Sequence, residues 1–217
     1  PLDYDGSVKE IFLTLYHCSV MHILPKKLFS FPVRLFEYLD QRKVNTLNWA
    51  AAALKLLAEH QALDSPKKPT FIKRVFFSGE VMPNRVLNYF REHYPQVQFV
   101  NLYGPTEATF NCSYFIVDRP FSDDADLPIG KPFPNTALMV LNEDGQPVQA
   151  GETGEIYIRG TGLALGYYND PEATQDAFVQ NPIHQAFPER VYKTGDLGRY
   201  NNLGELMFVS RVDHQIK

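Results

Sequence analysis

The chain has 217 residues, of which 44% are hydrophobic and 21% charged, and a formal net charge of -4. Such a chain can bury a substantial core, in one large domain or two small ones. The acidic balance gives no reason to expect a nucleic-acid partner, because binding to a phosphate backbone needs concentrated positive charge. No apolar run approaches the length of a membrane span and no signal peptide opens the chain, so we expect a cytoplasmic protein without membrane contact.

The first half alternates between predicted strands and predicted helices. A helix is expected to start near Ser7 as N-cap, with Glu10 completing a capping box. Strands are predicted at 20–24, 44–47, 71–77 and 97–102, and helices at 33–42, 49–60 and 83–93. This alternation implies a largely parallel sheet with helices on its faces.

The second half is rich in predicted strands. Residues 112–117 are β-like, and 118–134 form a polar connector that contains prolines. Further strands are predicted at 136–141, 154–160, 192–200 and 205–209, with hairpin turns between them. The fold class is therefore α/β, a parallel sheet with flanking helices followed by a β-rich distorted barrel. We expect two subdomains, 1–117 and 118–217.

A polar turn follows the predicted strand 97–102. Tyr103 offers an aromatic face to a base, Thr106 a hydroxyl to a phosphate oxygen, and Glu107 a carboxylate suited to Mg²⁺. Ligands of open α/β sheets bind beyond the carboxyl ends of the strands, so this turn is well placed for a nucleotide. The alternative is a surface turn whose tyrosine packs on its neighbours.

Three further clusters accompany the stretch 101–109. They are 154–160 continuing to Gly166-Tyr167, then 192–199, and finally 210–217. In this order the four motifs resemble those of the adenylate-forming (AMP-binding) enzymes, above all the amino-acid adenylation domains of nonribosomal peptide synthetases and the D-alanine:carrier-protein ligases. The resemblance places the chain in the large N-terminal domain of such enzymes. It implies conversion of ATP and an amino acid to aminoacyl-AMP and pyrophosphate, then transfer to a phosphopantetheinylated carrier protein or domain.

The resemblance also implies a nucleotide site. Thr106 is expected at the α-phosphate, Glu107 at Mg²⁺, and Asp196 at the ribose hydroxyls, with Arg211 adding hydrogen-bond donors. The backbone of Gly79 and Glu80 is expected along the adenine, and the remaining nucleotide-site residues are Asn101, Tyr103 and Gly104. Taken singly, Asp196 could be a turn residue and Arg211 a surface cation.

The amino-acid pocket is implied in the same way. Asp5 would hold the substrate's α-ammonium group; the alternative is an additional cap of the first helix. The rest of the lining would be Gly6, Lys9, Asn48, Phe76, Ser78, Leu102, Phe110 and Asn111. Most relatives have an apolar side chain where Lys9 stands, so we expect a polar or acidic substrate side chain. The alternative is that Lys9 points to solvent.

Asp213 matches the hinge about which the family's C-terminal domain rotates, although relatives usually have glycine where Ser210 stands. The family's Ser/Thr-Gly-x-Pro-Lys phosphate loop and its C-terminal catalytic lysine are not found in the sequence. Both ends are also expected to be cut. We therefore expect an internal fragment that does not catalyse adenylation alone. Two alternatives remain open: an acyl- or aryl-CoA ligase of the same fold, and a non-catalytic binding or scaffold relative.

Overall fold

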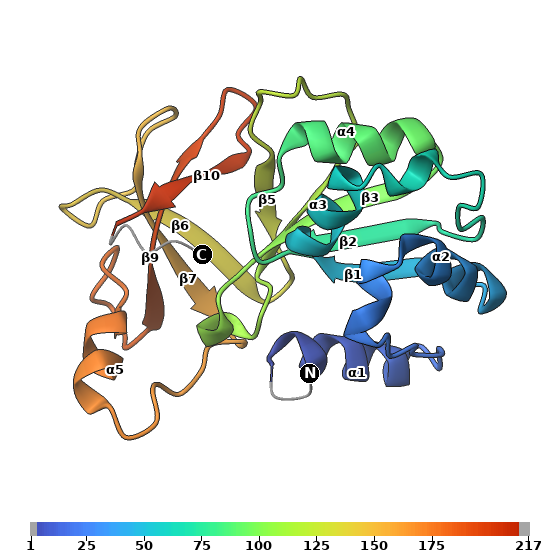
Figure 1. Cartoon of the computed structure of the whole chain (residues 1–217). Helices are drawn as coiled ribbons and strands as arrows, with labels where there is room; N and C mark the ends of the chain where they lie inside the picture. The colour runs from blue at the N-terminus through green and yellow to red at the C-terminus, as the bar shows by residue number, and fades with distance from the viewer. Residues whose placement is uncertain (1–3, 213–217) are drawn as a thin grey trace. The chain divides into compact units, whose positions relative to one another are not determined.

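The computed structural model describes residues 4–212, and the chain divides into two compact units (Figure 1). The first unit runs to Asn101 and also contains 116–127, whereas the second contains 102–115 and the chain from Pro128 onward. The expected boundary after residue 117 differs from this division. The polar turn that follows Tyr103 belongs with the β-rich second unit.

The first unit is built on a parallel sheet. Strands β1 (Thr46–Ala50), β2 (Arg74–Ser78) and β3 (Gln98–Tyr103) pair in parallel. Val75, Phe77 and Phe99 are almost completely buried in it. A parallel strand covered on both faces needs such continuous apolar character, and the expected strands 44–47, 71–77 and 97–102 are found within a few residues.

Three helices supply many of the other buried residues of this core. They are α2 (Pro32–Gln41), α3 (Ala51–Glu59) and α4 (Asn84–His93). Each buries an apolar stripe at helical spacing, as in Leu35 and Leu39 of α2 and Leu54 and Leu57 of α3. The three expected helices are thus confirmed, with α3 starting two residues late because Trp49 and Ala50 complete β1. None of the helices in the described part of the chain has the length and apolar character that a membrane crossing requires.

The side chain of Asn84 in α4 binds the connector segment 116–127 to the first unit. Its Nδ2 donates hydrogen bonds to the carbonyl oxygens of Ser122 and Ala125. Asn84 is almost fully buried, so these bonds satisfy donors that would otherwise be costly to bury. They explain why 116–127 groups with the first unit.

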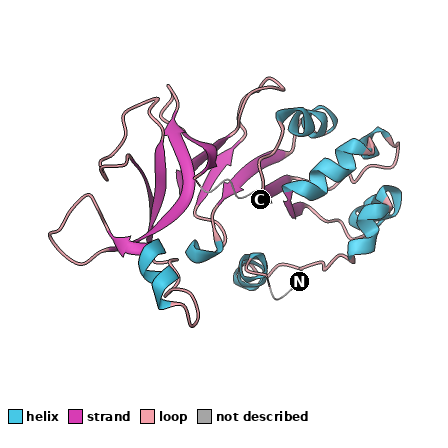
Figure 2. Ribbon diagram, turned by 60° about the vertical axis from the view of Figure 1, so that its left-hand side comes forward, coloured by secondary structure: helices cyan, strands magenta, loops and turns pink. Residues whose placement is uncertain are grey.

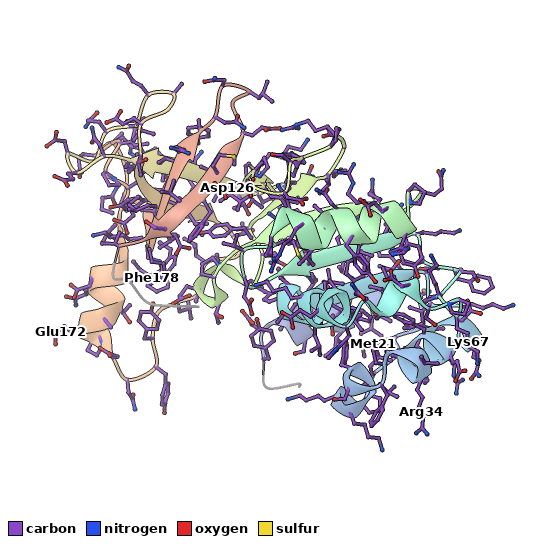
Figure 3. The ribbon with its side chains drawn as sticks, turned by 45° about the horizontal axis from the view of Figure 1, so that its top comes forward. Met21, Arg34, Lys67, Asp126, Glu172 and Phe178 are labelled. Carbon is purple, nitrogen blue, oxygen red and sulfur yellow. The ribbon has the colours of Figure 1, made fainter. Side chains whose placement is uncertain are left out.

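The strand expected at 20–24 is wrong. Residues 19–25 have no regular structure, and Val20, Met21 (labelled in Figure 3) and Ile23 are exposed. A 3-10 turn, Lys26–Ser30, follows directly. An apolar run becomes a strand only when a neighbouring strand pairs with it, and β1 pairs instead with β2.

The capping box expected at the first helix is also wrong. Helix α1 spans Gly6–Tyr16, so Ser7 lies inside it and Asp5 occupies the cap position without a side-chain cap hydrogen bond. Oε1 of Glu10 accepts a hydrogen bond from Nδ2 of Asn48 in β1, 2.8 Å away. Glu10 therefore contacts the sheet rather than its own helix terminus.

The second unit consists mainly of strands, coloured magenta in Figure 2, and these strands pair antiparallel. Ladders join β5, β10, β9, β7 and β6 in that order, with β8 beside β9 and β4 beside β5. The bounds are β4 (Ser113–Ile116), β5 (Pro128–Pro132), β6 (Thr136–Leu141), β7 (Gly154–Gly160), β8 (Phe178–Gln180), β9 (Arg190–Tyr200) and β10 (Leu206–Arg211). Ile156, Ile158 and Leu206 form the centre of its core. The expected mixed α/β class with a β-rich second part is confirmed.

Three elements of this unit were not predicted from the sequence. Strand β5 lies inside the expected polar connector, and β8 and α5 (Pro171–Ala177) fill the interval before β9. Helix α5 did have a sequence signal. Asp170 accepts a hydrogen bond from the backbone of Ala173, 3.0 Å away, and Pro171 opens the helix.

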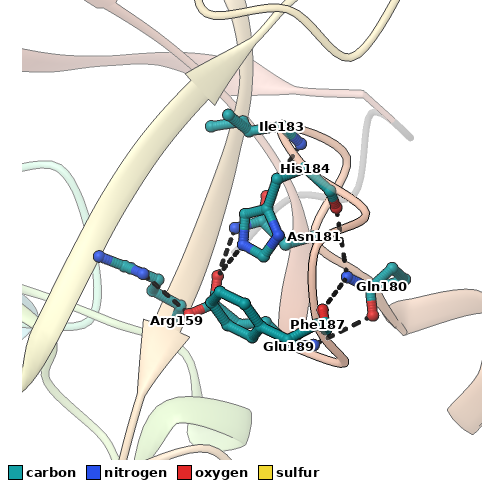
Figure 4. A network of polar contacts seen from close by, with 7 residues as sticks. All are labelled: Arg159, Gln180, Asn181, Ile183, His184, Phe187 and Glu189. Atoms are coloured by element: carbon teal, nitrogen blue, oxygen red, sulfur yellow. Dashed lines mark hydrogen bonds and ion pairs between the residues drawn. The ribbon is translucent and has the colours of Figure 1, made fainter.

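The carboxylate of Glu189 links the two ends of the loop between β8 and β9 by hydrogen bonds (Figure 4). The side chain of Glu189 accepts hydrogen bonds from Asn181 (2.6 Å), His184 (3.0 Å) and Arg159 of β7 (2.8 Å). The bond from Asn181, followed by that from His184, lowers the pKa of Glu189 from 4.5 to about 2. These donors favour the ionised form.

Replacing Glu189 with Gln should therefore lower the thermal midpoint of unfolding at pH 7. We expect a loss on the order of 2–4 °C, comparable to the net contribution of one hydrogen bond in a chain of this size. Because the folded pKa lies below the unfolded one, the contribution of Glu189 is present above about pH 4.5 and is lost as the pH falls toward 2. The melting points of the variant and of the unaltered chain, measured from about pH 2 to pH 7, should approach each other toward the acid end. Glu143→Gln, at an exposed turn, is the control, and an equal effect of both variants would contradict the assignment.

Candidate functional site

The polar turn after β3 is tightly folded. A Cβ atom on Gly104 would lie 2.7 Å from backbone atoms of Phe110, Asn111 and Cys112, so only glycine fits there. Thr109 and Phe110 both adopt left-handed backbone conformations, with φ of 58° and 71°. Consecutive non-glycine residues in this region indicate local strain, which is common at functional sites. Just before them, the 3-10 turn Thr106–Ala108 presents Thr106 to solvent and leaves Glu107 partly exposed.

A buried carboxylate lies at the centre of the second unit. Asp196 of β9 has only 1% of its side chain exposed. Its Oδ2 accepts a hydrogen bond from the hydroxyl of Tyr103 at 2.6 Å, and its Oδ1 accepts one from Nη1 of Arg211 at 3.0 Å. Burial, then the charge of Asp196, raises the pKa of Tyr103 well above 10, so its hydroxyl remains a donor at neutral pH.

This arrangement joins three of the predicted nucleotide-site residues. Asp196 is buried in a strand and Arg211 is mostly buried, so neither is a free surface group. Tyr103 is 9% exposed and directs its hydroxyl to Asp196, which leaves little of its ring face open to a base in this conformation. Asn101 is buried in the first unit. The ligand roles of all four remain predictions.

The carboxylate of Glu107 also has a tyrosine partner, Tyr167. The hydroxyl of Tyr167 donates to Oε1 of Glu107 at 2.6 Å. Burial and this hydrogen bond raise the pKa of Tyr167. Burial, followed by hydrogen bonding with Tyr167, raises the pKa of Tyr192 as well. Both hydroxyls are therefore protonated at neutral pH beside the carboxylate.

The chemistry of Glu107 fits a Mg²⁺ ligand whose other ligands come from the substrate. Among the described residues, no group of three His, Cys, Asp or Glu side chains could hold a metal. Mg²⁺ commonly uses one or two carboxylates together with water and substrate phosphates rather than a cage made by protein alone. A carboxylate can accept about four hydrogen bonds or ligand contacts, so the bond from Tyr167 leaves capacity for a cation.

In the first unit, three of the predicted pocket residues lie at the start of α1 and on β1. Oδ1 of Asp5 is buried and has no hydrogen-bond partner among residues 4–212. Nζ of Lys9 donates to Oδ1 of Asn48 at 2.8 Å, and burial lowers the pKa of Lys9 to about 8. The alternative in which Lys9 points to solvent does not hold. Asp5 is likewise not a side-chain cap of the helix.

The remaining predicted residues fall in both units. In the first, Phe76 is the register partner of Asn48, and Ser78 lies two residues further along β2 on the same face. Gly79 follows with φ of 90° and open space around its Cα, and Glu80 is paired with Lys55 at 2.6 Å. Gly6 is buried in the first unit, and the second unit holds Leu102, Phe110 and Asn111. Their union into one pocket remains a prediction, and Asp213 lies outside the described residues.

Comparison with protein-family models matches residues 1–168 to "AMP-binding enzyme". The match covers well over half of the chain. The chain belongs to the AMP-binding enzyme family.

Relatives of this AMP-binding chain include very large proteins. A plipastatin synthase protein of Bacillus subtilis (strain 168) is 34% identical over 216 residues, and a linear gramicidin synthase protein of Brevibacillus parabrevis is 35% identical over 221. The alignments cover 99% and 100% of the chain but only 6% and 3% of these relatives. The chain therefore spans a small part of their length.

Solved structures agree with the assignment. The crystal structure of IdnL1 superposes with a TM-score of 0.90 at 32% identity, over the whole chain and 45% of IdnL1. PA1221, described as an NRPS protein containing adenylation and PCP domains, gives 0.82 at 29% identity, over the whole chain and 43% of PA1221. The expected resemblance to adenylation domains of nonribosomal peptide synthetases is confirmed.

The site of this AMP-binding chain also contains residues that sequence reasoning did not select. Tyr167 and Tyr192 belong to motifs that were recognised, but nothing in their spacing showed that the hydroxyl of Tyr167 bonds to Glu107 or that Tyr192 interacts with Tyr167. Arg190 donates to the carbonyl oxygens of Ala164 and Leu165 and lay outside the recognised motifs.

Replacing Tyr103 with Phe should destabilise the second unit. The variant removes the tyrosine donor from Oδ2 of a buried carboxylate, which costs about 1–3 kcal/mol. Urea denaturation monitored by circular dichroism measures this loss. Tyr168→Phe, at a 93% exposed tyrosine, should change the unfolding free energy by less than about 0.5 kcal/mol. Equal stability of the Tyr103 variant and the unaltered chain would show that the bond contributes nothing.

Proposed function

We propose that this chain supplies nucleotide- and amino-acid-binding residues of an amino-acid-activating ligase. The ligase converts ATP and an amino acid to aminoacyl-AMP and pyrophosphate and then loads a phosphopantetheinylated carrier protein or domain. The observation that carries the proposal is Oδ1 of Asp5, a buried carboxylate oxygen without a hydrogen-bond partner in the described chain. Burying such an oxygen is costly, and the α-ammonium group of an amino acid would supply the missing donor.

The second unit supplies groups suited to the nucleotide. In the proposed reaction an oxygen of the amino acid's carboxylate attacks the α-phosphorus of ATP, and the bond to the pyrophosphate leaving group breaks. Thr106 contacts the α-phosphate with its hydroxyl, while Asp196 accepts from the ribose and Arg211 adds donors. Mg²⁺ held by Glu107 would neutralise phosphate charge. In the first unit, the open space at Gly79, next to Glu80, suits a flat base. Asn101, Tyr103 and Gly104 are the remaining proposed nucleotide residues.

The relatives support the carrier as a partner. PA1221 combines adenylation and PCP domains by its description. A thioester-forming half-reaction needs a conformational change, for which the sequence offers Asp213 as a hinge. The present chain matches 6% of its plipastatin synthase relative, so this wider activity is a proposal about the longer protein that would contain it.

Amino-acid-dependent ATP–pyrophosphate exchange by that longer protein is the direct test. We expect exchange with one amino acid in a screen of L- and D-amino acids and simple carboxylic acids. Asp5→Asn removes the charge that meets the ammonium, so kcat/KM should fall about 30-fold or more, equivalent to at least about 2 kcal/mol. Asp144→Asn, at an exposed turn, is the matched control.

Other outcomes would point elsewhere. Exchange only with acids that lack an amine would indicate an acyl- or aryl-CoA ligase, and no exchange with any acid would indicate a non-catalytic binding or scaffold role. The 217-residue polypeptide by itself should give no exchange, because its sequence contains no Ser/Thr-Gly-x-Pro-Lys loop. Appreciable aminoacyl-adenylate formation by it would refute that expectation.

We further infer that the substrate has a polar or acidic side chain. Lys9 donates a hydrogen bond to Asn48 of β1. The register partner of Asn48 on the adjacent strand β2 is Phe76, another predicted pocket residue. An ammonium group in partly buried surroundings favours an anionic or polar ligand, because its own desolvation is costly. A burial-lowered pKa of about 8 leaves Lys9 mostly protonated at neutral pH.

Lys9→Met should therefore change the substrate preference toward apolar amino acids. For an acidic substrate, kcat/KM of the unaltered protein should fall above about pH 8 as Lys9 loses its proton, and the Met variant should lack this decline. Exchange assays from about pH 6.5 to 9.5 bracket that pKa and measure both effects. Lys67→Met, at an exposed lysine, should retain preference and pH profile. Unchanged preference in the Lys9 variant would refute the inference.

A further inference from the structure

Within the second unit, the segment 160–167 is bound to the polar turn at Thr106–Ala108. Its backbone contributes two contacts. The amide of Ala164 donates to the carbonyl oxygen of Glu107 at 2.8 Å, and the hydroxyl of Thr109 donates to the carbonyl oxygen of Gly162 at 2.7 Å. The third contact is the hydrogen bond from Tyr167 to Oε1 of Glu107. Both the backbone and the carboxylate of Glu107 are therefore held by one segment.

Tyr167 is itself fixed in place. Its amide donates to Oγ1 of Thr174 in α5 at 2.9 Å, and its ring centroid lies 5.8 Å from that of Phe178 (labelled in Figure 3). Arg190 lies over Phe178 with its guanidinium carbon 4.9 Å from the ring centroid and donates to two carbonyl oxygens of the segment. The tyrosine hydroxyl consequently approaches Glu107 from a constrained direction.

We propose that Tyr167 is a positioning residue for the cation site: its hydroxyl holds Oε1 of Glu107 and orients the carboxylate toward Mg²⁺ on the substrate phosphates. The proposal rests on the proposed function of Glu107. Hydrogen bonds to a ligating carboxylate orient it, and losing such a partner typically weakens metal binding about 10–100-fold.

Stability alone gives a poor account of this bond. Tyr167 is 37% exposed and Glu107 is partly exposed, so water competes for both groups. A hydrogen bond in such surroundings contributes little to the unfolding free energy. Its effect should instead be seen in the orientation of the carboxylate.

The test measures Mn²⁺ binding to the longer protein of the proposed function. Electron paramagnetic resonance of Mn²⁺ in the presence of α,β-methylene-ATP reports cation affinity in a complex that cannot react. Tyr167→Phe removes only the hydroxyl and should lower Mn²⁺ affinity about 10-fold. Binding of adenosine, which has no phosphate and needs no cation, should be unchanged. Tyr168→Phe, at the exposed neighbouring tyrosine, should match the unaltered protein in both measurements.

A double-variant comparison isolates the route through Glu107. Glu107→Gln should weaken Mn²⁺ binding, and adding Tyr167→Phe to it should have no further effect. The proposal is overturned if Tyr167→Phe keeps the original Mn²⁺ affinity, if it weakens adenosine binding equally, or if its effect persists in the Glu107→Gln background. Mn²⁺ binding that does not depend on Glu107 would also overturn it. Failure of the proposed ligase activity is a separate result, seen as absent pyrophosphate exchange by the unaltered protein.

Discussion

The second unit depends on the need to pair a buried carboxylate. Removing the charge of Asp196 from water costs several kcal/mol, and breaking such a buried pair is strongly destabilising. Tyr103 and Arg211 offset this cost from the end of β3 and from β10. Three segments far apart in the sequence are thereby fixed around one group. The same pairing gives the carboxylate a defined orientation, which a ligand-binding role would require.

Three carboxylates differ in what remains available to a ligand. Asp196 is buried and bonded on both oxygens, and Glu107 is partly exposed and bonded to one tyrosine. Asp5 has a buried oxygen without a hydrogen-bond partner in the described chain. These surroundings suit different chemistry. An accessible carboxylate can coordinate a cation that keeps part of its water shell. A buried carboxylate oxygen instead favours a positively charged hydrogen-bond donor such as an ammonium group. The surroundings of Glu107 and Asp5 suit the roles proposed for them, whereas the ribose role of Asp196, whose two oxygens are already bonded, stays a prediction.

Sequence reasoning recovered much of the first unit because its signals are local. Helices α2, α3 and α4 follow from apolar residues at helical spacing, and β2 and β3 from continuous apolar runs. The sequence predictions were wrong where contacts with residues distant in the sequence decide the local conformation. Residues 20–24 are apolar enough for a strand but do not pair with one, and Glu10 contacts Asn48 instead of closing a capping box. Strand β5 was missed because its Pro-Ile-Gly-Lys-Pro sequence has weak strand propensity and depends on pairing with β4 and β10.

The sequence by itself determined the family, through four ordered motifs, and selected Asp5, Thr106, Glu107, Asp196 and Arg211 as chemically capable residues. Motif order and residue chemistry are properties of the chain and need no coordinates. Only the tertiary structure showed that Tyr103 bonds to Asp196, that Lys9 contacts Asn48, and that Tyr167 holds Glu107. These contacts join residues 93, 39 and 60 positions apart. Spacing along the sequence carries no information about such distances, because burial and strand pairing bring the partners together.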